Sequence, residues 1–254
     1  MSAPFRWGLI GAGDVARNFG ASAALVPGHE VAAVASRRLD RAEVAAAALG
    51  GARALTDYAE LVADPALDAV YIATPAALHR DHVALALEAG KPVLCEKPFT
   101  VTAAEARDLA ALAKTTGTFL MEAMWTRFIP AIQALKVRIA AGEIGEVRMI
   151  QADLGFAVPY DPSNRFFAPE LGGGALLDLG IYPLSLAWYL LGPPDAGQML
   201  VGEAPNGVDA RASMVLRFPG GALASLSCSF DQRLANRAVV TGTRGSLALD
   251  APLY

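Results

Sequence analysis

An acid and a base, Glu96 and Lys97, directly follow a short apolar run at residues 93–95. That run predicts a buried strand, and the next residue, Pro98, disfavours helical backbone at Lys97 and cannot donate to a sheet. We therefore expect Glu96 and Lys97 at the carboxyl end of a strand, where open α/β sheets bind their ligands. A lysine there can polarise an oxygen or exchange a proton, although a solvated lysine in a turn fits the local sequence equally well.

A second acid and a phenol, Asp178 and Tyr182, interrupt an apolar stretch that follows three glycines at 172–174. The stretch predicts a helix over 175–191, and side chains four residues apart share one face of a helix. A carboxylate and a phenol on one face can take part in proton transfer. The alternative is ordinary packing, with an aspartate favoured by the dipole at a helix start and a tyrosine whose ring is buried.

Gly11, Gly13 and Ala16 form the pattern G-x-G-x-x-A between a strand-like run and the start of a helix. The first glycine permits a tight turn, the second lets a pyrophosphate approach the backbone, and the alanine lets the helix pack closely on the strand. The amino end of that helix offers amide donors to phosphate. Because another strand follows at 30–35, the context favours dinucleotide binding over a chance glycine match.

The strand at 30–35 ends in Ser36, Arg37 and Arg38. A site that prefers NAD usually carries an acid here for the ribose 2′-hydroxyl, but the first acid, Asp40, comes beyond both arginines. A hydroxyl and two guanidinium groups suit a 2′-phosphate, so we expect NADP as the cofactor, with NAD also possible. The alternative is that both arginines are solvated residues before the next helix.

Strand and helix patterns alternate over residues 1–122, with further strands predicted at 69–73 and 119–122. This alternation predicts an α/β domain with a doubly wound parallel sheet, the Rossmann architecture, which would bind the NADP. Helix starts are also recognisable. Thr56 is expected to cap a short helix, and the stretch 102–105 has the form of a capping box.

Three residues after the strand at 69–73 are expected at the cofactor, because they follow its carboxyl end. They are Thr74, Pro75 and His79. We place Glu96 at the same edge of the sheet. A histidine in a helix is more often only a polar residue on one face, which is the alternative for His79.

The pattern changes after residue 142, where strands begin to follow one another directly. Strands are predicted at 147–155, 211–218, 222–230 and 237–241. A proline and two glycines at 219–221 are typical of a hairpin turn between two of them. We therefore predict a C-terminal α+β domain over residues 123–254, with a largely antiparallel open sheet and one inserted helix.

The composition favours a compact globular chain, because hydrophobic residues make up 54% and charged residues 18% of the sequence. The formal net charge is −4 without runs of basic residues, so we expect neither nucleic acid nor membrane as a partner. Cys95 and Cys228 lie in strand-like runs without partner spacing and are predicted to be buried free thiols. No metal-ligand spacing, signal peptide or membrane-spanning run is visible, which favours a soluble cytoplasmic protein.

The sequence resembles the glucose–fructose oxidoreductase/inositol dehydrogenase (Gfo/Idh/MocA) family over essentially its whole length. The glycine turn, the stretch 96–98 and the three glycines followed by Asp178 match that family in order. The pattern Asp-x-Gly-x-Tyr that ends at Tyr182, and the stretch 120–128, are similar to the subgroup of dimeric dihydrodiol dehydrogenase and NADP-dependent D-xylose dehydrogenase. Many other members carry a histidine in place of this tyrosine.

The resemblance implies an NADP-dependent dehydrogenase with Lys97 and Tyr182 as its catalytic pair and Asp178 in support. It also implies three residues near the substrate, namely Trp125, Arg127 and Phe156. Hydride would pass from a hydroxyl-bearing carbon of a sugar, polyol or cyclic diol to NADP, while Tyr182, assisted by Lys97, accepts the hydroxyl proton. A homodimer or higher homo-oligomer is the expected assembly.

Two other functions stay open from the sequence. A cofactor-binding sensor would bind NADPH without turnover, but it would not need Lys97, Asp178 and Tyr182 together. A reductase for an imine or an enone would use the same residues, so substrate profiling has to separate it from a dehydrogenase.

Members of the family usually continue for several tens of residues beyond the point where this sequence stops, at Tyr254. Those residues normally complete the second sheet. We therefore expect an uncovered sheet edge, which is open to pairing with another chain.

Overall fold

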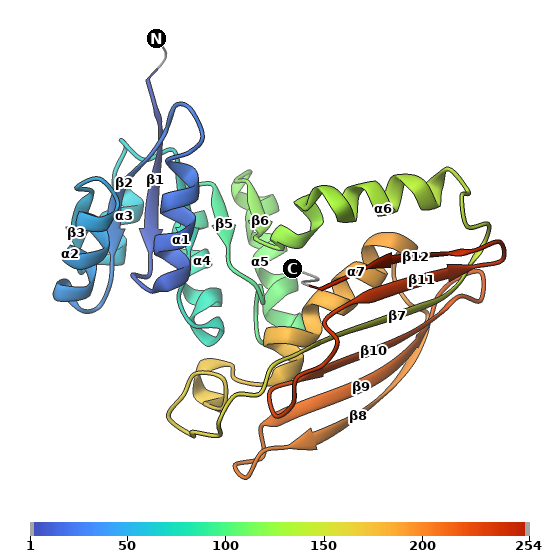
Figure 1. The fold of residues 1–254 in the computed structure, drawn as a ribbon. Helices are drawn as coiled ribbons and strands as arrows, with labels where there is room; N and C mark the ends of the chain where they lie inside the picture. The colour runs from blue at the N-terminus through green and yellow to red at the C-terminus, as the bar shows by residue number, and fades with distance from the viewer. Residues whose placement is uncertain (1–2, 252–254) are drawn as a thin grey trace. The chain divides into compact units, whose positions relative to one another are not determined.

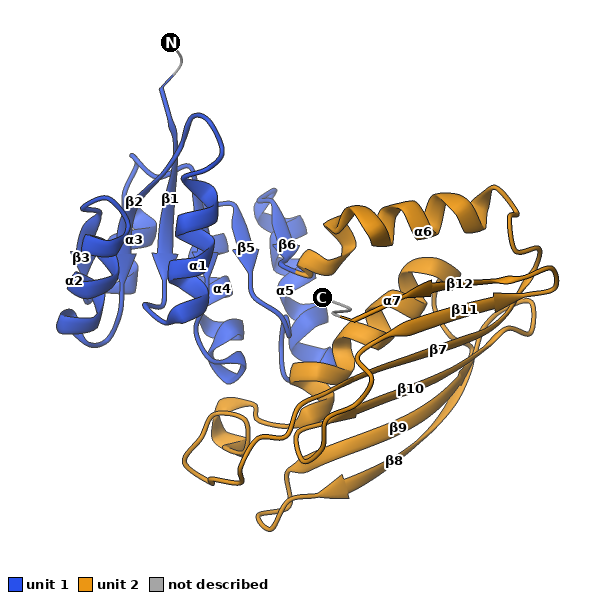
Figure 2. Cartoon of the chain, viewed as in Figure 1, with its two compact units in different colours: residues 1–123 blue, residues 124–254 orange. Residues whose placement is uncertain are grey.

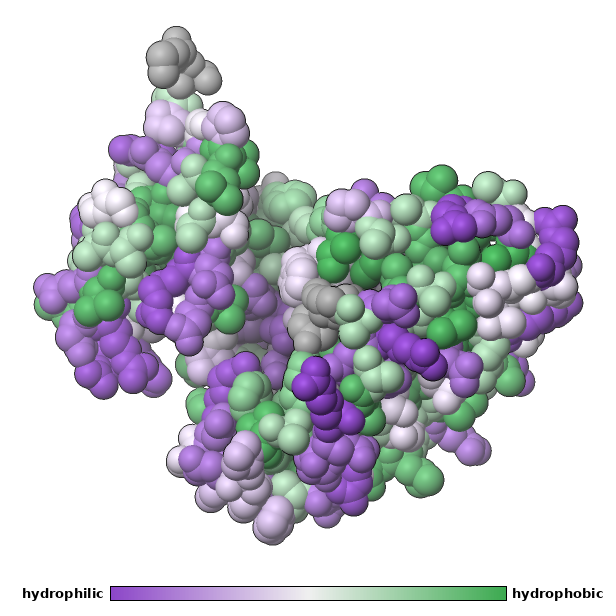
Figure 3. Space-filling model, in the orientation of Figure 1, coloured by the Kyte–Doolittle hydropathy of each residue, from purple (hydrophilic) through white to green (hydrophobic). Residues whose placement is uncertain are grey.

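The computed structural model, whose described residues are 3–251, divides into two compact units, Met1–Ala123 and Met124–Tyr254 (Figure 2). Each unit contains one six-stranded sheet and its own buried apolar cores. Hydrophilic and hydrophobic residues are intermixed on the face of the protein that Figure 3 displays.

The sheet of the first unit is parallel throughout and has the order β3-β2-β1-β4-β5-β6 (Figure 1). Its strands are β1 (Phe5–Ile10), β2 (His29–Ala35), β3 (Arg53–Leu55), β4 (Ala69–Ile72), β5 (Val93–Cys95) and β6 (Leu120–Glu122). The helices are α1 (Asp14–Ala23), α2 (Leu39–Ala48), α3 (Tyr58–Ala63), α4 (His79–Glu88) and α5 (Ala103–Thr116). This confirms the predicted doubly wound sheet, whose strand order reverses between β1 and β4, where such sheets bind ligands.

Helices cover both faces of this sheet, which explains why its strands are apolar throughout rather than alternating. All four residues of β4 are buried. On one face, Leu9 of β1 packs in a cluster with Ala16 of α1 and Ala45 of α2. On the opposite face, Ile10 and Ile72 belong to a cluster with residues of α3, α4 and α5.

The starts of two helices in this unit test the predicted caps. Thr102 and Glu105 form the predicted capping box, each side chain accepting a hydrogen bond from the backbone of the other residue. The prediction that Thr56 caps the short helix α3 is wrong by one residue. The cap is Asp57, whose carboxylate accepts the N–H of Ala59 at 2.8 Å. Both residue types cap helices well, so only the backbone geometry decides between neighbours.

The sheet of the second unit has the order β12-β11-β7-β10-β9-β8. Its strands are β7 (Val147–Gly155), β8 (Ala196–Glu203), β9 (Asp209–Arg217), β10 (Leu223–Ser229), β11 (Ala238–Gly242) and β12 (Ser246–Leu249). The pair β7–β10 is parallel and the other pairs are antiparallel, which confirms the largely antiparallel sheet. The edge strands β8 and β12 were not predicted. Almost all of β8 is exposed, so it lacks the alternation that reveals a half-buried strand.

Two helices, α6 (Pro130–Ala140) and α7 (Ile181–Leu191), bury one face of this sheet (Figure 1). Leu135 of α6 and Leu186 of α7 share a core with Ile150 of β7 and Leu226 of β10. Along β9, buried and exposed residues alternate, as expected for a strand with one solvated face.

The segment that carries Asp178 and Tyr182 begins differently from the helix predicted over 175–191. Leu176–Gly180 is a π-helical turn, and the α-helical part is Ile181–Leu191. Such turns are rare, have no local sequence signal, and occur frequently at functional sites. Among the described residues, Pro169–Leu191 is also the one segment apolar and long enough to span a membrane. Half of its most apolar window is buried, and its packing on the sheet explains this apolar composition.

Candidate functional site

Gly11 ends β1 in a conformation that glycine adopts most readily, with φ of +111°. Its N–H donates to the carbonyl of Ala35 at 2.9 Å, and a Cβ atom here would lie 2.6 Å from the carbonyl oxygen of Ala73. The backbone therefore turns between the ends of β2 and β4, where a side chain does not fit. This is the tight turn that the sequence predicted.

Gly13 precedes α1 in extended conformation, and no side chain caps the helix. A Cβ atom at Gly13 would meet nothing within 4 Å, so the space above this residue is open. Ala16, by contrast, is fully buried against the sheet. The amino end of α1 is therefore not covered by a side-chain cap, and the space beside Gly13 is open.

The residues after β2 hold one another in place. The N–H of Arg38 donates to Oγ of Ser36 at 3.4 Å, and Nε of Arg38 donates to Asp40 at 3.0 Å. Hydrogen bonding with Arg38 lowers the pKa of the Asp40 carboxyl. The sequence interpretation treated both Arg37 and Arg38 as available to a 2′-phosphate, whereas Arg38 is already paired with Asp40.

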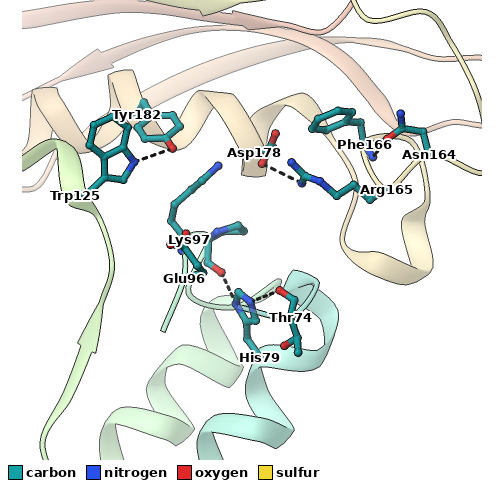
Figure 4. A network of polar contacts seen from close by, with 11 residues as sticks. Thr74, His79, Glu96, Lys97, Trp125, Asn164, Arg165, Phe166, Asp178 and Tyr182 are labelled. Carbon is teal, nitrogen blue, oxygen red and sulfur yellow. Dashed lines mark hydrogen bonds and ion pairs between the residues drawn. The ribbon is translucent and has the colours of Figure 1, made fainter. Parts of the chain in front are cut away.

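His79 joins the loops that follow β4 and β5. Its side chain is buried, with Nδ1 2.9 Å from the carbonyl oxygen of Pro98 and Nε2 2.7 Å from that of Thr74 (Figure 4). Burial lowers the pKa of His79, so the neutral ring donates to one of the two carbonyls. Both ring nitrogens of His79 therefore face backbone carbonyls, and its contact with a cofactor stays a prediction.

Thr74 is also linked to the next turn of α4. Its Oγ1 lies 3.0 Å from Nδ1 of His82, whose ring packs edge-on against Tyr58. The pKa of His82 is lowered, chiefly by burial, with a contribution from the charge of Arg37. The loop after β4 is thus held by two histidines from one helix, next to an arginine from the end of β2.

Glu96 and Lys97 follow β5 directly, as predicted. The hydroxyl of Tyr71 donates to one oxygen of Glu96, and the N–H of Lys97 donates to the other at 3.1 Å. The ring of Tyr71 stacks on Phe19, with 3.8 Å between centroids. The Lys97–Pro98 peptide bond is cis. Glu96 therefore holds the backbone of the loop that carries Lys97.

Tyr182 lies in the first turn of α7 and is 9% exposed. Nε1 of Trp125 donates a hydrogen bond to its hydroxyl oxygen at 3.3 Å, and the two rings pack edge to face (Figure 4). A donor at a phenol oxygen stabilises the phenolate more than the phenol. The contact therefore suits a tyrosine that accepts a proton.

A small pocket in the second unit lies beside Tyr182, and Arg127, Ser185 and Tyr189 also line it. Nε of Arg127 donates to Oγ of Ser185 at 3.2 Å. The Nζ of Lys136 lies 3.8 Å from the ring centre of Tyr189. Among the residues that line the pocket, Arg127 thus supplies a positive charge and Ser185 a hydroxyl group.

Asp178 and Phe156 occupy other places in this unit. Oδ1 of Asp178 lies 3.5 Å from Nη1 of Arg165, and the Asp178 side chain is 14% exposed (Figure 4). Phe156 packs against an apolar cluster that includes Phe167 and Phe230. The structure therefore brings Trp125 to Tyr182 through a hydrogen bond and places Arg127 at the same pocket. Asp178 pairs with Arg165, which the sequence interpretation did not single out.

Three polar residues in these surroundings were missed from the sequence. Ser185 follows Tyr182 by three helical positions, a spacing that could have indicated a shared face. Arg165 and Asp209 carry no such signal, because their partners are remote in sequence. Within residues 3–251 no group of three or more histidine, cysteine or acidic side chains is arranged to hold a metal ion. Both cysteines are buried and free, as predicted.

Both units match models of a single protein family. Residues 5–124 match the oxidoreductase family with an NAD-binding Rossmann fold, and residues 132–248 match the GFO/IDH/MocA C-terminal domain. The chain belongs to the GFO/IDH/MocA oxidoreductase family. It is therefore an NAD(P)-dependent oxidoreductase, and the resemblance stated from the sequence is confirmed.

Two mammalian relatives carry the same name. Trans-1,2-dihydrobenzene-1,2-diol dehydrogenase from Mus musculus is 41% identical over 244 residues, which cover 94% of this chain and 73% of the mouse enzyme. The Homo sapiens enzyme is 38% identical over 253 residues, which cover 98% of this chain and 75% of the human enzyme. These relatives are enzymes, which favours a dehydrogenase over a sensor.

Two solved structures are similar over nearly the whole chain. A 3-ketoreductase from Actinomadura kijaniata in complex with NADP and TDP-benzene has a TM-score of 0.89 and 31% identity, covering 98% of this chain and 77% of that one. An aldose-aldose oxidoreductase from Caulobacter crescentus complexed with glycerol has a TM-score of 0.92 and 28% identity, covering 99% and 78%. The chain thus spans about three quarters of the length of its relatives.

Proposed function

We propose that this enzyme transfers a hydride between NADP and a hydroxyl-bearing carbon of a sugar, a polyol or a cyclic diol. The observation that carries the proposal is the hydrogen bond from Trp125 to the hydroxyl of Tyr182 at the edge of a small pocket. It favours the phenolate of Tyr182, which is the form that accepts a proton, next to Arg127 and Ser185, which can bind a substrate oxygen. Relatives named for a dihydrobenzenediol and for aldoses support this substrate class.

The catalytic roles follow from the chemistry of the side chains. NADP, when bound, supplies the hydride acceptor for oxidation. Tyr182, as its phenolate, accepts the proton of the substrate hydroxyl, and the indole N–H of Trp125 is proposed to stabilise that phenolate before the transfer. Lys97 is proposed to assist Tyr182, because its positive charge lowers the cost of forming the phenolate. Asp178 is proposed to support Tyr182 from the preceding turn.

Cofactor binding is proposed at the edge of the first sheet where the strand order reverses. The pyrophosphate would bind above Gly13 at the amino end of α1, where the space is open. Ser36 and Arg37 would bind the 2′-phosphate, with Arg38 contributing less because Asp40 already pairs with it. The remaining residues proposed to line this site, all at or near the ends of β1, β4 and β5, are Gly11, Ala16, Thr74, Pro75, His79, Glu96 and Lys97.

A panel of substrates, followed by nicotinamide absorbance, tests the proposal. It includes trans-1,2-dihydrobenzene-1,2-diol, D-xylose, other aldoses and a polyol, each with NADP and with NAD. We expect reduction of NADP by at least one of them, and loss of that activity in Tyr182→Phe with NADP affinity retained. Absence of turnover with every compound, in folded protein that binds NADP, would contradict the proposal.

The relative named as a 3-ketoreductase favours a second candidate, the reduction of a keto group on a sugar. Tyr182 would then donate its proton to the oxygen of the carbonyl that receives the hydride. NADPH oxidation with keto sugars, and with an imine and an enone as further probes, distinguishes these reactions. Faster reduction of the keto sugar than oxidation of any alcohol would identify this second candidate.

A further inference from the structure

The segment that carries Asp178 and Tyr182 has no cap of its own. The residue at the cap position, Ala175, has helical backbone angles, and its side chain accepts no hydrogen bond from the turn. The first amides of a helix point away from it and need acceptors from elsewhere. Three glycines precede the segment, and glycines have no side chain that could fill this role.

Asp209, at the start of β9, supplies the missing acceptor. Its Oδ2 accepts the N–H of Leu176 at 2.6 Å, across a separation of 33 residues in sequence. Gly174 makes room for the carboxylate, because a Cβ atom at this position would overlap Oδ1 of Asp209. The φ of Gly174 is +135°, which also favours glycine. The position of the Asp209 carboxylate therefore explains why the third residue of this run is a glycine.

A second contact holds the same turn on the neighbouring strand. A Cβ atom at Gly180 would lie 3.0 Å from Sγ of Cys228 in β10, so the absence of a side chain lets the turn lie close to the sheet. The π-helical turn is thus held at its beginning by Asp209 and at its end by close packing on Cys228. Asp178 lies between these two points, and Tyr182 lies directly after them.

We propose that Asp209 is a positioning residue for the reaction, which fixes the turn that carries Asp178 and thereby the place of the Tyr182 hydroxyl. This inference rests on the proposed role of Tyr182 as the proton acceptor. The contact between Trp125 and Tyr182 depends on where α7 begins, so a shift of the turn displaces the phenol oxygen from its donor. A displacement of about 1 Å can lower a rate by about 10²-fold.

The charged form of the Asp209 carboxylate is disfavoured by burial. Burial raises the pKa of Asp209, although hydrogen bonds from the backbone at Leu176 and Ala175 act in the opposite direction. An asparagine at this position can still accept the N–H of Leu176 through its amide oxygen, without the charge. An alanine cannot accept this hydrogen bond. Comparing the two variants therefore tests whether the hydrogen bond to Leu176 is what matters at position 209.

The test compares Asp209→Asn and Asp209→Ala with Asp57→Asn and Asp57→Ala. Asp57 is a matched control, because its carboxylate also accepts a helical N–H but caps α3, which carries none of the proposed catalytic residues. The measurements are thermal melts, amide hydrogen exchange at Leu176, NADP affinity, and the rate of a single hydride transfer from trans-1,2-dihydrobenzene-1,2-diol or D-xylose, whichever the unmodified enzyme oxidises faster.

We expect Asp209→Ala to expose the Leu176 amide to exchange and to lower the hydride-transfer rate by about 10²-fold, with NADP affinity unchanged within about twofold. Asp209→Asn should restore most of both properties. The Asp57 variants should lose stability without slowing hydride transfer. If Asp209→Ala does not fold, Asp209→Ser replaces it, because the shorter side chain does not reach the Leu176 N–H, and the same loss of rate relative to Asp209→Asn is expected.

A folded Asp209→Ala variant with an exchanging Leu176 amide and an unchanged hydride-transfer rate overturns the inference. So does protection of that amide in Asp209→Ala, because the hydrogen bond would then not hold the turn. In the fallback comparison, an Asp209→Ser variant with an exchanging Leu176 amide and the rate of Asp209→Asn overturns it as well. Failure of the proposed function is recognised separately, since Tyr182→Phe would then keep its rate whatever the Asp209 variants do.

Discussion

The indole Nε1 of Trp125 donates a hydrogen bond to the hydroxyl oxygen of Tyr182 at 3.3 Å. The residues are 57 positions apart in sequence, and the rings meet edge to face with centroids 6.4 Å apart. The donor can only be the indole, because tryptophan has no acceptor at nitrogen. The phenol oxygen is therefore held as an acceptor, which is the polarity that a base for a substrate hydroxyl requires.

Replacement of Tyr182 by phenylalanine removes that oxygen and keeps the ring. We expect turnover to fall by about 10²–10⁴-fold, the usual contribution of a positioned acid or base. NADP affinity should survive, because the glycine turn and Arg37 are unchanged.

Lys97→Met should produce a similar loss, and the double variant should lose little more, since groups that act as a unit are not additive. Single-turnover hydride transfer measures all three, with melts as the folding control, and a Tyr182→Phe enzyme that keeps most of its rate ends the catalytic assignment.

Replacement of Trp125 by phenylalanine keeps an aromatic ring and removes the N–H donor. We expect a loss of about fivefold to tenfold in kcat near neutral pH, which corresponds to a hydrogen bond of about 1 kcal/mol. Single-turnover hydride transfer checks this, with thermal melts as the folding control. An unchanged rate in a folded variant would mean that Trp125 contributes only packing.

Replacement of Arg37 tests the choice of cofactor. Arg37→Ala should weaken NADP binding by about 1–3 kcal/mol and leave NAD binding nearly unchanged, because only NADP carries the 2′-phosphate. Asp40→Asn should tighten NADP binding, since it releases Arg38 from its ion pair. Replacing both arginines should weaken NADP further than Arg37→Ala alone. Titration calorimetry with both cofactors measures each effect, and equal affinity of the unmodified enzyme for NADP and NAD would refute the assignment.

His79 should make stability depend on pH. Burial lowers its pKa below the ordinary value of 6.5, so below that value the unfolded chain takes up a proton that the folded chain does not. Stability is therefore lost as the pH falls through about 6.5, by at most about 1.4 kcal/mol per pH unit for one proton. His79→Gln should reduce this dependence between pH 7.5 and 5.5. Urea unfolding at several pH values measures this dependence. If His79→Gln leaves the pH dependence of stability unchanged, His79 is not its source. His82→Gln serves as the comparison, since burial lowers the pKa of His82 as well.

Replacement by alanine should affect different properties at the two glycines of the first turn, namely stability at Gly11 and NADP binding at Gly13. Gly11→Ala should lower the free energy of unfolding by more than about 1 kcal/mol, because of the positive φ and the clash with the carbonyl of Ala73. Gly13→Ala should change stability by less than about 0.5 kcal/mol, because its surroundings are open and its φ is −78°. It should nevertheless weaken NADP binding, since the new methyl occupies the proposed pyrophosphate position. Chemical unfolding and cofactor titration separate the two effects, and a Gly13→Ala variant with unchanged NADP affinity would place the pyrophosphate elsewhere.

The sequence by itself determined the parts of this protein that depend on local physics. An apolar run predicted the strand β1, and the backbone freedom of glycine predicted the turn at Gly11 and the start of the helix after Gly13. The capping box at Thr102 and the hairpin turn at 219–221 are equally local. The alternation of these elements was sufficient to predict the doubly wound sheet.

Only the tertiary structure decided which distant side chains meet. The pairs Trp125 with Tyr182 and Leu176 with Asp209 are separated by 57 and 33 residues, so no local pattern predicts either contact. The edge strand β8 was missed because it is exposed on both faces and lacks alternation. The π-helical turn at 176–180 likewise reflects how its ends are held on β9 and β10. Local propensity selects the elements, whereas packing and strand register bring together the groups that are proposed to move a proton.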